Sequence, residues 1–145
     1  MPGEVNRDPV CLFCRIVDGE IPSITVHEDD STLAFMDISP ATDGHLLVIP
    51  KKHAKDLGEI GADDLAAVTS VAQKLARVQL DKLGATGVNL INNWGESAWQ
   101  SVFHFHLHVI PRYADDPAKD SLKLPWNPTP GDQDRIAAAA AALTD

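Results

Sequence analysis

The sequence predicts an α+β domain built on an antiparallel sheet of about five strands, with one main helix and a second helix near the C-terminus. Two short strand-like runs lie next to each other early in the chain, separated only by a turn. Only one long helical pattern lies between the predicted strands, so the chain lacks the alternation of strands and helices that is typical of a parallel sheet. A strand with strict alternation of residue types comes after this helix.

The predicted elements begin with a hairpin. Residues 24–28 and 31–37 read as its two strands, and Asp29-Asp30 forms the turn between them. Residues 45–49 (HLLVI) form a third, apolar strand that ends at Pro50.

The main helix is predicted over residues 62–83. Asp63 and Asp64 suit its first turn, where the helix dipole favours negative charge, and Gly84 suits its end. Apolar residues recur along it at helical spacing. They are Leu65, Val68, Val71, Ala72, Leu75, Val78 and Leu83.

Two more strands and one more helix complete the prediction. Residues 88–91 and 102–110 read as strands, and the second of them ends at Pro111. A proline-rich extended segment follows, and then a mostly alanine helix over 133–143 with Asp132 as its N-cap.

Length and charge limit the classes of function. A chain of 145 residues suits a single domain, and a net charge of −9 argues against a general nucleic-acid partner, which requires a basic face. The first ten residues lack the apolar core of a signal peptide, and no apolar run approaches the roughly 20 residues of a membrane span. We therefore expect a soluble, cytoplasmic protein with no membrane or nucleic-acid partner.

Three histidines alternate with apolar residues in the segment VFHFHLHVI. Because strand side chains alternate between faces, the strand would present the three rings on one solvent-facing side, about 7 Å apart, and anchor itself in the core by the other. The three are His104, His106 and His108. The pattern fits a solvated edge strand, a metal site, or nucleophilic catalysis at phosphorus by a neutral imidazole.

Three segments of the chain carry a family resemblance. Residues 100–112 (QSVFHFHLHVIPR) resemble the signature of the histidine triad (HIT) family, in which histidines alternate with apolar residues on a strand. Residues 35–40 (FMDISP) and 44–53 (GHLLVIPKKH) resemble its nucleotide-binding, Hint-like branch, and residues 11–23 resemble its bacterial members. The resemblance implies the HIT-like fold.

The resemblance covers most of the chain and distinguishes a core from a C-terminal extension. It implies one HIT domain over residues 1–145, with a core at about 11–113 and a C-terminal extension at 114–145. It also implies a homodimer in which helix 62–83 and strand 88–91 meet their copies.

The resemblance also implies roles for individual residues. His106 matches the nucleophile that takes the nucleotidyl group, His108 the member close to the phosphate, His104 the member that supports the site, and His45 a fourth histidine packed against them. Asp37 matches the acid that binds the ribose hydroxyls. Phe35 and Ile38 match walls of the base pocket, and the polar groups around the phosphate match Asn93, Gln100 and Ser101.

Simpler interpretations exist for several of these positions. Asp37 can cap a turn and Phe35 can belong to the core. Trp94 and Trp99 are departures, because relatives favour small or polar residues there, commonly glycine at the second position; two bulky rings would narrow the leaving-group side. Trp126, in the extension, would either cover a partner's site or pin the tail.

A pair of cysteines, Cys11 and Cys14, has the spacing of half a tetrahedral zinc site, although two buried thiols would leave the same pattern. The resemblance implies His53 and His104 as the remaining ligands. Zinc held in this way would be structural, with no open position for water. We expect no organic cofactor.

The predicted function is hydrolysis or transfer at the α-phosphorus of purine nucleoside phosphoramidates or related conjugates, through a nucleotidyl-histidine intermediate. Alternatives are hydrolysis of dinucleoside polyphosphates and a zinc- and nucleotide-binding regulator with little turnover. A metallohydrolase with all three triad histidines on one ion is disfavoured, because the outer pair would be about 13–14 Å apart along a strand.

Overall fold

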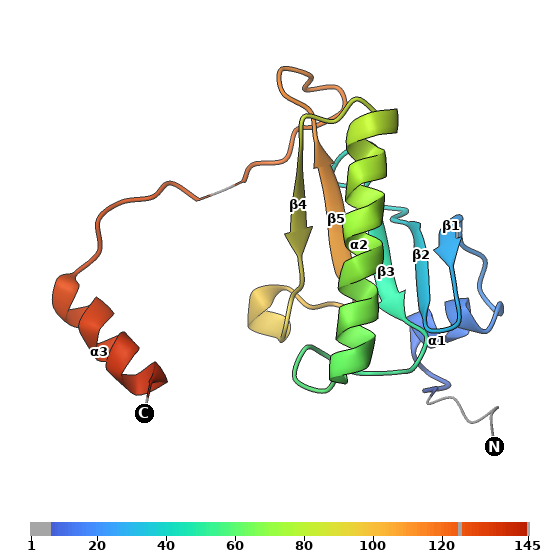
Figure 1. Ribbon diagram of the computed structural model, residues 1–145, viewed down its shortest axis with the longest axis horizontal. Coiled ribbons are helices and arrows are strands. Elements are labelled where there is room, and N and C mark those ends of the chain that lie inside the picture. The colour runs from blue at the N-terminus through green and yellow to red at the C-terminus, as the bar shows by residue number, and fades with distance from the viewer. Residues whose placement is uncertain (1–6, 125, 145) are drawn as a thin grey trace.

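The computed structural model describes residues 7–124 and 126–144, and its centre is a five-stranded antiparallel sheet with one long helix across a face (Figure 1). The strands lie in the order β1-β2-β3-β5-β4. The elements in chain order are α1 (Leu12–Val17), β1 (Thr25–Glu28), β2 (Thr32–Met36), β3 (Leu46–Pro50), α2 (Ala62–Lys82), β4 (Gly87–Ile91), the 3-10 helix η1 (Glu96–Ala98), β5 (Leu107–Arg112) and α3 (Gln133–Leu143). The predicted α+β class and antiparallel sheet are confirmed.

The hairpin β1–β2 closes at the predicted turn. The carboxylate of Asp29 accepts hydrogen bonds from the backbone N–H groups of Ser31 and Thr32, each at 2.9 Å. It also accepts one from the Thr32 hydroxyl at 2.7 Å. An aspartate that satisfies the donors just after it is the usual way to hold a short turn.

Two apolar cores lie on opposite faces of the sheet because side chains alternate along each strand. One face packs under α2, with Val68, Ala72 and Leu75 among its buried residues. The other face packs against α1, where Phe13 meets Phe35 edge to face at a centroid distance of 5.4 Å. The sheet is therefore covered on both sides.

Helix α2 begins and ends as predicted. Asp63 and Asp64 occupy its first turn, and Gly84 follows it with a φ of 74°, the left-handed conformation that stops a helix. A buried polar residue, Gln79, donates from Nε2 to the carbonyls of Gly44 and Val109 and so ties α2 to the sheet.

The predicted strand over 102–110 is shorter than expected at its start. Strand β5 begins at Leu107, where its pairing with both neighbours stops: the last pair with β4 is Ile91–His108 and the last pair with β3 is Val48–Leu107. The preceding residues leave the sheet, and the Phe105 N–H donates instead to the carbonyl of Ala54 at 2.7 Å. His104 and His106 therefore lie in a connecting segment, and only His108 lies in the strand.

The segment after β5 is held at its start by Arg112 and leads to α3. Arg112 donates from Nε to Asp120 at 2.8 Å and from Nη2 to the carbonyl of Leu122 at 2.9 Å. The predicted N-cap Asp132 is confirmed, since it accepts from the backbone of Asp134 and Arg135. Among the described residues, no helix combines the length and apolarity needed to cross a membrane. Residues 1–6, most of the segment predicted to carry no signal, are outside the described part.

Candidate active site and metal centre

Helix α1 brings two thiols to the centre of the molecule. Cys11 is its N-cap, and the Cys11 sulfur accepts a hydrogen bond from the backbone N–H of Cys14 at 3.3 Å. Sequence reasoning placed no helix here, because a six-residue helix is too short to leave a clear periodic pattern.

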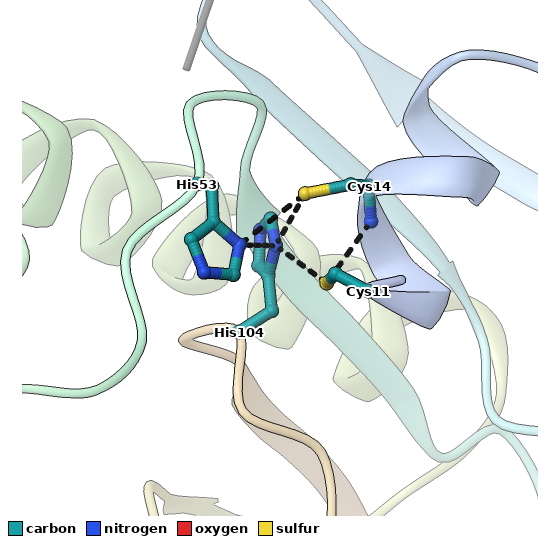
Figure 2. A group of neighbouring side chains, drawn as sticks. All are labelled: Cys11, Cys14, His53 and His104. Carbon is teal, nitrogen blue, oxygen red and sulfur yellow. Dashed lines mark hydrogen bonds between the residues drawn. The ribbon is translucent and has the colours of Figure 1, made fainter. Parts of the chain in front are cut away.

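Two histidines meet the two thiols (Figure 2). Nδ1 of His104 lies 3.4 Å from Sγ of Cys11 and 3.5 Å from Sγ of Cys14. Nδ1 of His53 lies 3.3 Å from Sγ of Cys14 and 3.3 Å from Nδ1 of His104. All four atoms lie within 4.8 Å of one another, although the residues come from three separate segments.

These separations match the edges of a tetrahedron around zinc. With Zn–S near 2.3 Å and Zn–N near 2.0–2.1 Å, a regular tetrahedron has S–N edges of about 3.5 Å and an N–N edge of about 3.3–3.4 Å. Two thiolates and two imidazoles are also a usual donor set for structural zinc. The residues present therefore fit the ion that the sequence predicts.

The ring of His104 is held in the tautomer that a metal needs. Its Nε2 lies 2.8 Å from the carbonyl of Pro50, which can only accept, so Nε2 carries the proton and Nδ1 presents a lone pair to the cluster. The side chain is 0% exposed, and burial lowers the pKa of His104 to about 4. Burial raises the pKa of the Cys14 thiol to about 11.

His106 is oriented by the backbone carbonyl of His104. Its Nδ1 donates to the carbonyl of His104 at 2.8 Å, which leaves the lone pair on Nε2. Sequence reasoning missed Asn92, whose Nδ2 donates to the carbonyl of His106 at 3.0 Å. The expected solvent-facing row is wrong, because His106 is only 5% exposed and His104 is fully buried.

A second chain of hydrogen bonds fixes His108. The backbone N–H of Ala41 donates to Nδ1 of His45 at 3.0 Å, so the proton of neutral His45 is on Nε2. That nitrogen lies 2.9 Å from Nδ1 of His108 and donates to it. The proton of neutral His108 is therefore on its Nε2, where it can serve as a donor.

Burial keeps this group of histidines uncharged near neutral pH. It is the largest cause of the lowered pKa of His45 and of His106. It also lowers the pKa of His108 to about 4, with smaller contributions from the neighbouring His106 and His45. A neutral imidazole with a lone pair on Nε2 is the form in which His106 can act as a nucleophile.

A cavity of about 360 Å³ opens beside the triad. His106 and His108 form part of its wall, together with Ser101 and Asp37. Its apolar wall includes side chains from α1 and the loop after it, which sequence reasoning did not assign: Leu12, Phe13, Ile16 and Ile21. An apolar slot with a few polar groups at one end is typical of a small-molecule site.

The predicted base and ribose residues lie around this cavity. Phe35 lines it and is also part of the core, so both interpretations of that residue hold. Ile38 is 90% exposed at its rim. The carboxylate of Asp37 accepts from the Ser39 N–H at 2.8 Å through Oδ1, and its Oδ2 lies 3.5 Å from Nε2 of His45. Asp37 thus caps a turn while it borders the cavity.

Asn93 and Gln100 lie in the adjoining loop rather than along the cavity. The Gln100 side chain accepts from the Gly95 N–H at 2.8 Å and donates to the carbonyls of Lys55 and Val102. Asn93 Nδ2 lies 3.5 Å from the carbonyl of Trp99. Both amides therefore brace the loop.

The two unexpected tryptophans lie in this loop. Trp99 has a φ of 72° and is 86% exposed, so it does not narrow the cavity. The Trp94 ring lies against Gly58, where an added Cβ would be 2.5 Å from its Cζ2. Trp94 and Gly58 therefore join this loop to the one before α2.

One metal bound by all three triad histidines does not fit this geometry. Nδ1 of His104 points to the cysteine cluster and its Nε2 to Pro50. Nδ1 of His106 is held by a backbone carbonyl, and Nδ1 of His108 pairs with His45. The three rings serve three different purposes.

The comparisons with known proteins identify the family. The model of the HIT domain matches residues 18–115. The chain belongs to the HIT family. It is 50% identical over 104 residues to "Protein hit" of Bacillus subtilis (strain 168), an alignment that covers 71% of each chain.

Two solved HIT structures show the fold at higher coverage. A zinc-bound histidine triad family protein from Mycobacterium smegmatis superposes with a TM-score of 0.73 and 40% identity, over 92% of this chain and 94% of that one. A histidine triad nucleotide-binding protein from Candida albicans superposes with a TM-score of 0.78 and 36% identity, over 92% and 94%. These similarities confirm the HIT-like fold.

Proposed function

We propose that this HIT protein binds a purine nucleotide conjugate and breaks a bond at its α-phosphorus, with Nε2 of His106 as the nucleophile. The observation that carries the proposal is the hydrogen bond from Nδ1 of His106 to the carbonyl of His104, 2.8 Å long, which directs the lone pair of a neutral ring to the cavity. The Candida albicans neighbour, a histidine triad nucleotide-binding protein, supports the ligand class.

The proposed reaction has two displacements. Nε2 of His106 bonds to phosphorus as the P–N bond to the leaving amine breaks, and the amine takes up one proton from solvent. Water then bonds to the same phosphorus, the bond to His106 breaks, and one proton is released. The products are a free amine and a nucleoside monophosphate.

The surrounding groups suit the charges that develop. The ring of His106 becomes cationic when it carries phosphorus, and the carbonyl of His104 stabilises that charge through the Nδ1 proton. Nε2–H of His108 can donate to a phosphoryl oxygen, since its Nδ1 is occupied by His45. Water or a second substrate can reach the phosphorus because the cavity is open.

We propose a structural zinc at the cluster of Cys11, Cys14, His53 and His104. The ion would lock the His104 ring and tie α1 to the triad segment, and it supplies no bond-breaking chemistry because four protein ligands leave no open position. The zinc-bound Mycobacterium smegmatis neighbour supports this proposal. We also expect the protein to be cytoplasmic and to form a homodimer.

Trapping the intermediate tests the function. The protein is mixed with the lysyl phosphoramidate of AMP, denatured at alkaline pH within one turnover, and analysed by intact mass and peptide mapping. We expect one AMP group on His106 and release of lysine. AMP on another residue, or tight binding of the compound with no adduct and no turnover, contradicts the proposal, and the second result would favour a binding regulator.

A further inference from the structure

A second hollow lies on the opposite face of the sheet from the cavity. It has a volume of about 490 Å³ and runs beside the C-terminal half of α2, over β1, β2 and β3. We call it the α2 groove, defined by Val26, Met36, Leu46, Leu75, Val78 and Leu83. Three of these apolar side chains are substantially exposed, among them Val78 at 39%.

Helix α3 has an apolar side and no surface to cover it. In the described part of the chain, none of its residues is buried, and Ile136 and Leu143 are exposed. These two are seven residues apart, so they lie on one side of the helix, with the small Ala139 and Ala140 between them. A single narrow apolar stripe is the pattern of a helix that lies in a groove.

The length of α3 also indicates that this helix packs against a partner surface. An isolated helix of eleven residues is marginal in water even when it is rich in alanine, because nucleation is costly and few hydrogen bonds repay it. Most helical stability in proteins comes from packing of an apolar side. The helix therefore needs a partner surface to be stable.

The chain carries α3 away from its own groove. Figure 1 shows the arm leaving the end of the sheet where β5 finishes, passing β4, and placing α3 beyond the β4 edge, toward the other end of the sheet. The groove lies at the end where the arm leaves, on the β1–β3 side of α2. The Mycobacterium smegmatis structure aligns with 92% of this chain, so the alignment includes most of the 114–145 segment.

We propose that α3 of one copy docks in the α2 groove of a second copy, and that the two copies exchange their arms. A two-fold axis normal to the sheet beside β4 would turn the partner's groove to the lower side beyond the β4 edge, where α3 lies (Figure 1). Charge agrees, since Asp132 and Asp134 at the start of α3 would meet a groove whose lining includes two lysines, Lys82 and Lys119, and one aspartate, Asp43. This surface is separate from the chemistry proposed at His106.

Cross-linking between two differently labelled chains tests the exchange. One full-length chain carries Ile136→Cys and the other carries Val78→Cys, both with Cys11 and Cys14 retained, which are buried. The chains are mixed, allowed to exchange, and treated with a short bismaleimide. A matched control replaces Val78→Cys by Leu57→Cys, since Leu57 is 40% exposed and lies outside the groove.

We expect a cross-linked heterodimer from the Val78→Cys mixture at a yield at least tenfold above the Leu57→Cys control. Removal of residues 132–145 should weaken self-association in sedimentation by at least tenfold. The proposal is overturned if a chain that carries both cysteines cross-links only within itself, because α3 then packs on its own groove. It is also overturned if neither mixture cross-links and the shortened chain sediments as the full chain does, which would leave the groove to a different protein.

Discussion

The backbone carbonyl of His104 accepts the Nδ1 proton of His106 at 2.8 Å, while the ring of His104 reaches both cysteines of the metal cluster. One residue therefore serves two centres, by its main chain and by its side chain. A change that tilts the His104 ring also tilts the peptide that orients the nucleophile.

Replacement of the nucleophile should abolish turnover and leave the fold intact. We expect His106→Ala to lower kcat by about 10³-fold or more, because no other side chain can carry the nucleotidyl group. Single-turnover kinetics with the AMP phosphoramidate measures the loss. His27→Ala, which removes a histidine from β1, is the control and should retain activity. Activity of His106→Ala within tenfold of the wild type would rule out the nucleophile.

The Asp37 side chain should discriminate between sugars. Its carboxylate borders the cavity, so we expect Asp37→Ala to weaken binding of a ribonucleotide about tenfold and binding of the deoxyribonucleotide much less. Calorimetric titration with AMP and 2′-deoxy-AMP measures both. An equal loss for the two sugars would assign Asp37 to the turn at Ser39 alone.

Metal removal should lower thermal stability more than it lowers the rate of the chemical step. We expect about one zinc per chain in protein purified without added metal, and a fall in Tm of several degrees after chelation, since the ion closes a long loop in the unfolded chain. Elemental analysis and thermal unfolding of the wild type and Cys14→Ser check this. Metal well below half an equivalent, with the same Tm in the variant, would show that the cluster binds no zinc.

The ion pair between Arg112 and Asp120 should give stability that depends on pH. The hydrogen bond from Arg112 is the largest cause of the lowered pKa of Asp120, whose side chain is only 5% exposed. A carboxyl with a lowered folded-state pKa stabilises the protein above its unfolded pKa of about 4, and this contribution is lost as pH falls through the folded value. We expect Asp120→Asn to cost about 1–3 kcal/mol at pH 7.

Below about pH 4 the difference between Asp120→Asn and the wild type should shrink. Urea unfolding at pH 7, 5, 4 and 3 measures the free energy of unfolding at each step. Asp81→Asn, an exposed carboxylate on α2, is the control and should show a small difference at every pH. A difference for Asp120→Asn that stays constant from pH 7 to pH 3 would exclude a titrating carboxylate as its source.

Local patterns in the sequence were enough to place α2, α3 and the strands β1 to β4. The spacing of apolar residues placed α2 to within one residue of its end, and Asp132 marked the start of α3, because helix ends depend on a few neighbouring side chains. The alternation around the histidines correctly separated Phe105 and Leu107, which pack under α2, from His106, which lines the cavity on the other face.

Features that depend on distant parts of the chain were harder to predict. The start of β5 depends on where its pairing with β3 and β4 stops, which no residue between 102 and 107 indicates. The burial of His104 depends on α1, whose six residues carry too little periodicity to be recognised. The cluster of Cys11 and Cys14 with two histidines came from the family resemblance, because spacing alone cannot bring three separate segments to one point.

The contact between Trp94 and Gly58 has a consequence for how such a site can diverge. A Cβ at position 58 would lie 2.5 Å from one ring atom of Trp94 and 2.8 Å from another, so any side chain at position 58 would displace the ring. A smaller side chain at position 94 would remove this conflict, whereas a side chain at position 58 beside Trp94 requires the ring to move. A substitution at Gly58 therefore changes the position of the Trp94 ring as well as the loop that carries residue 58.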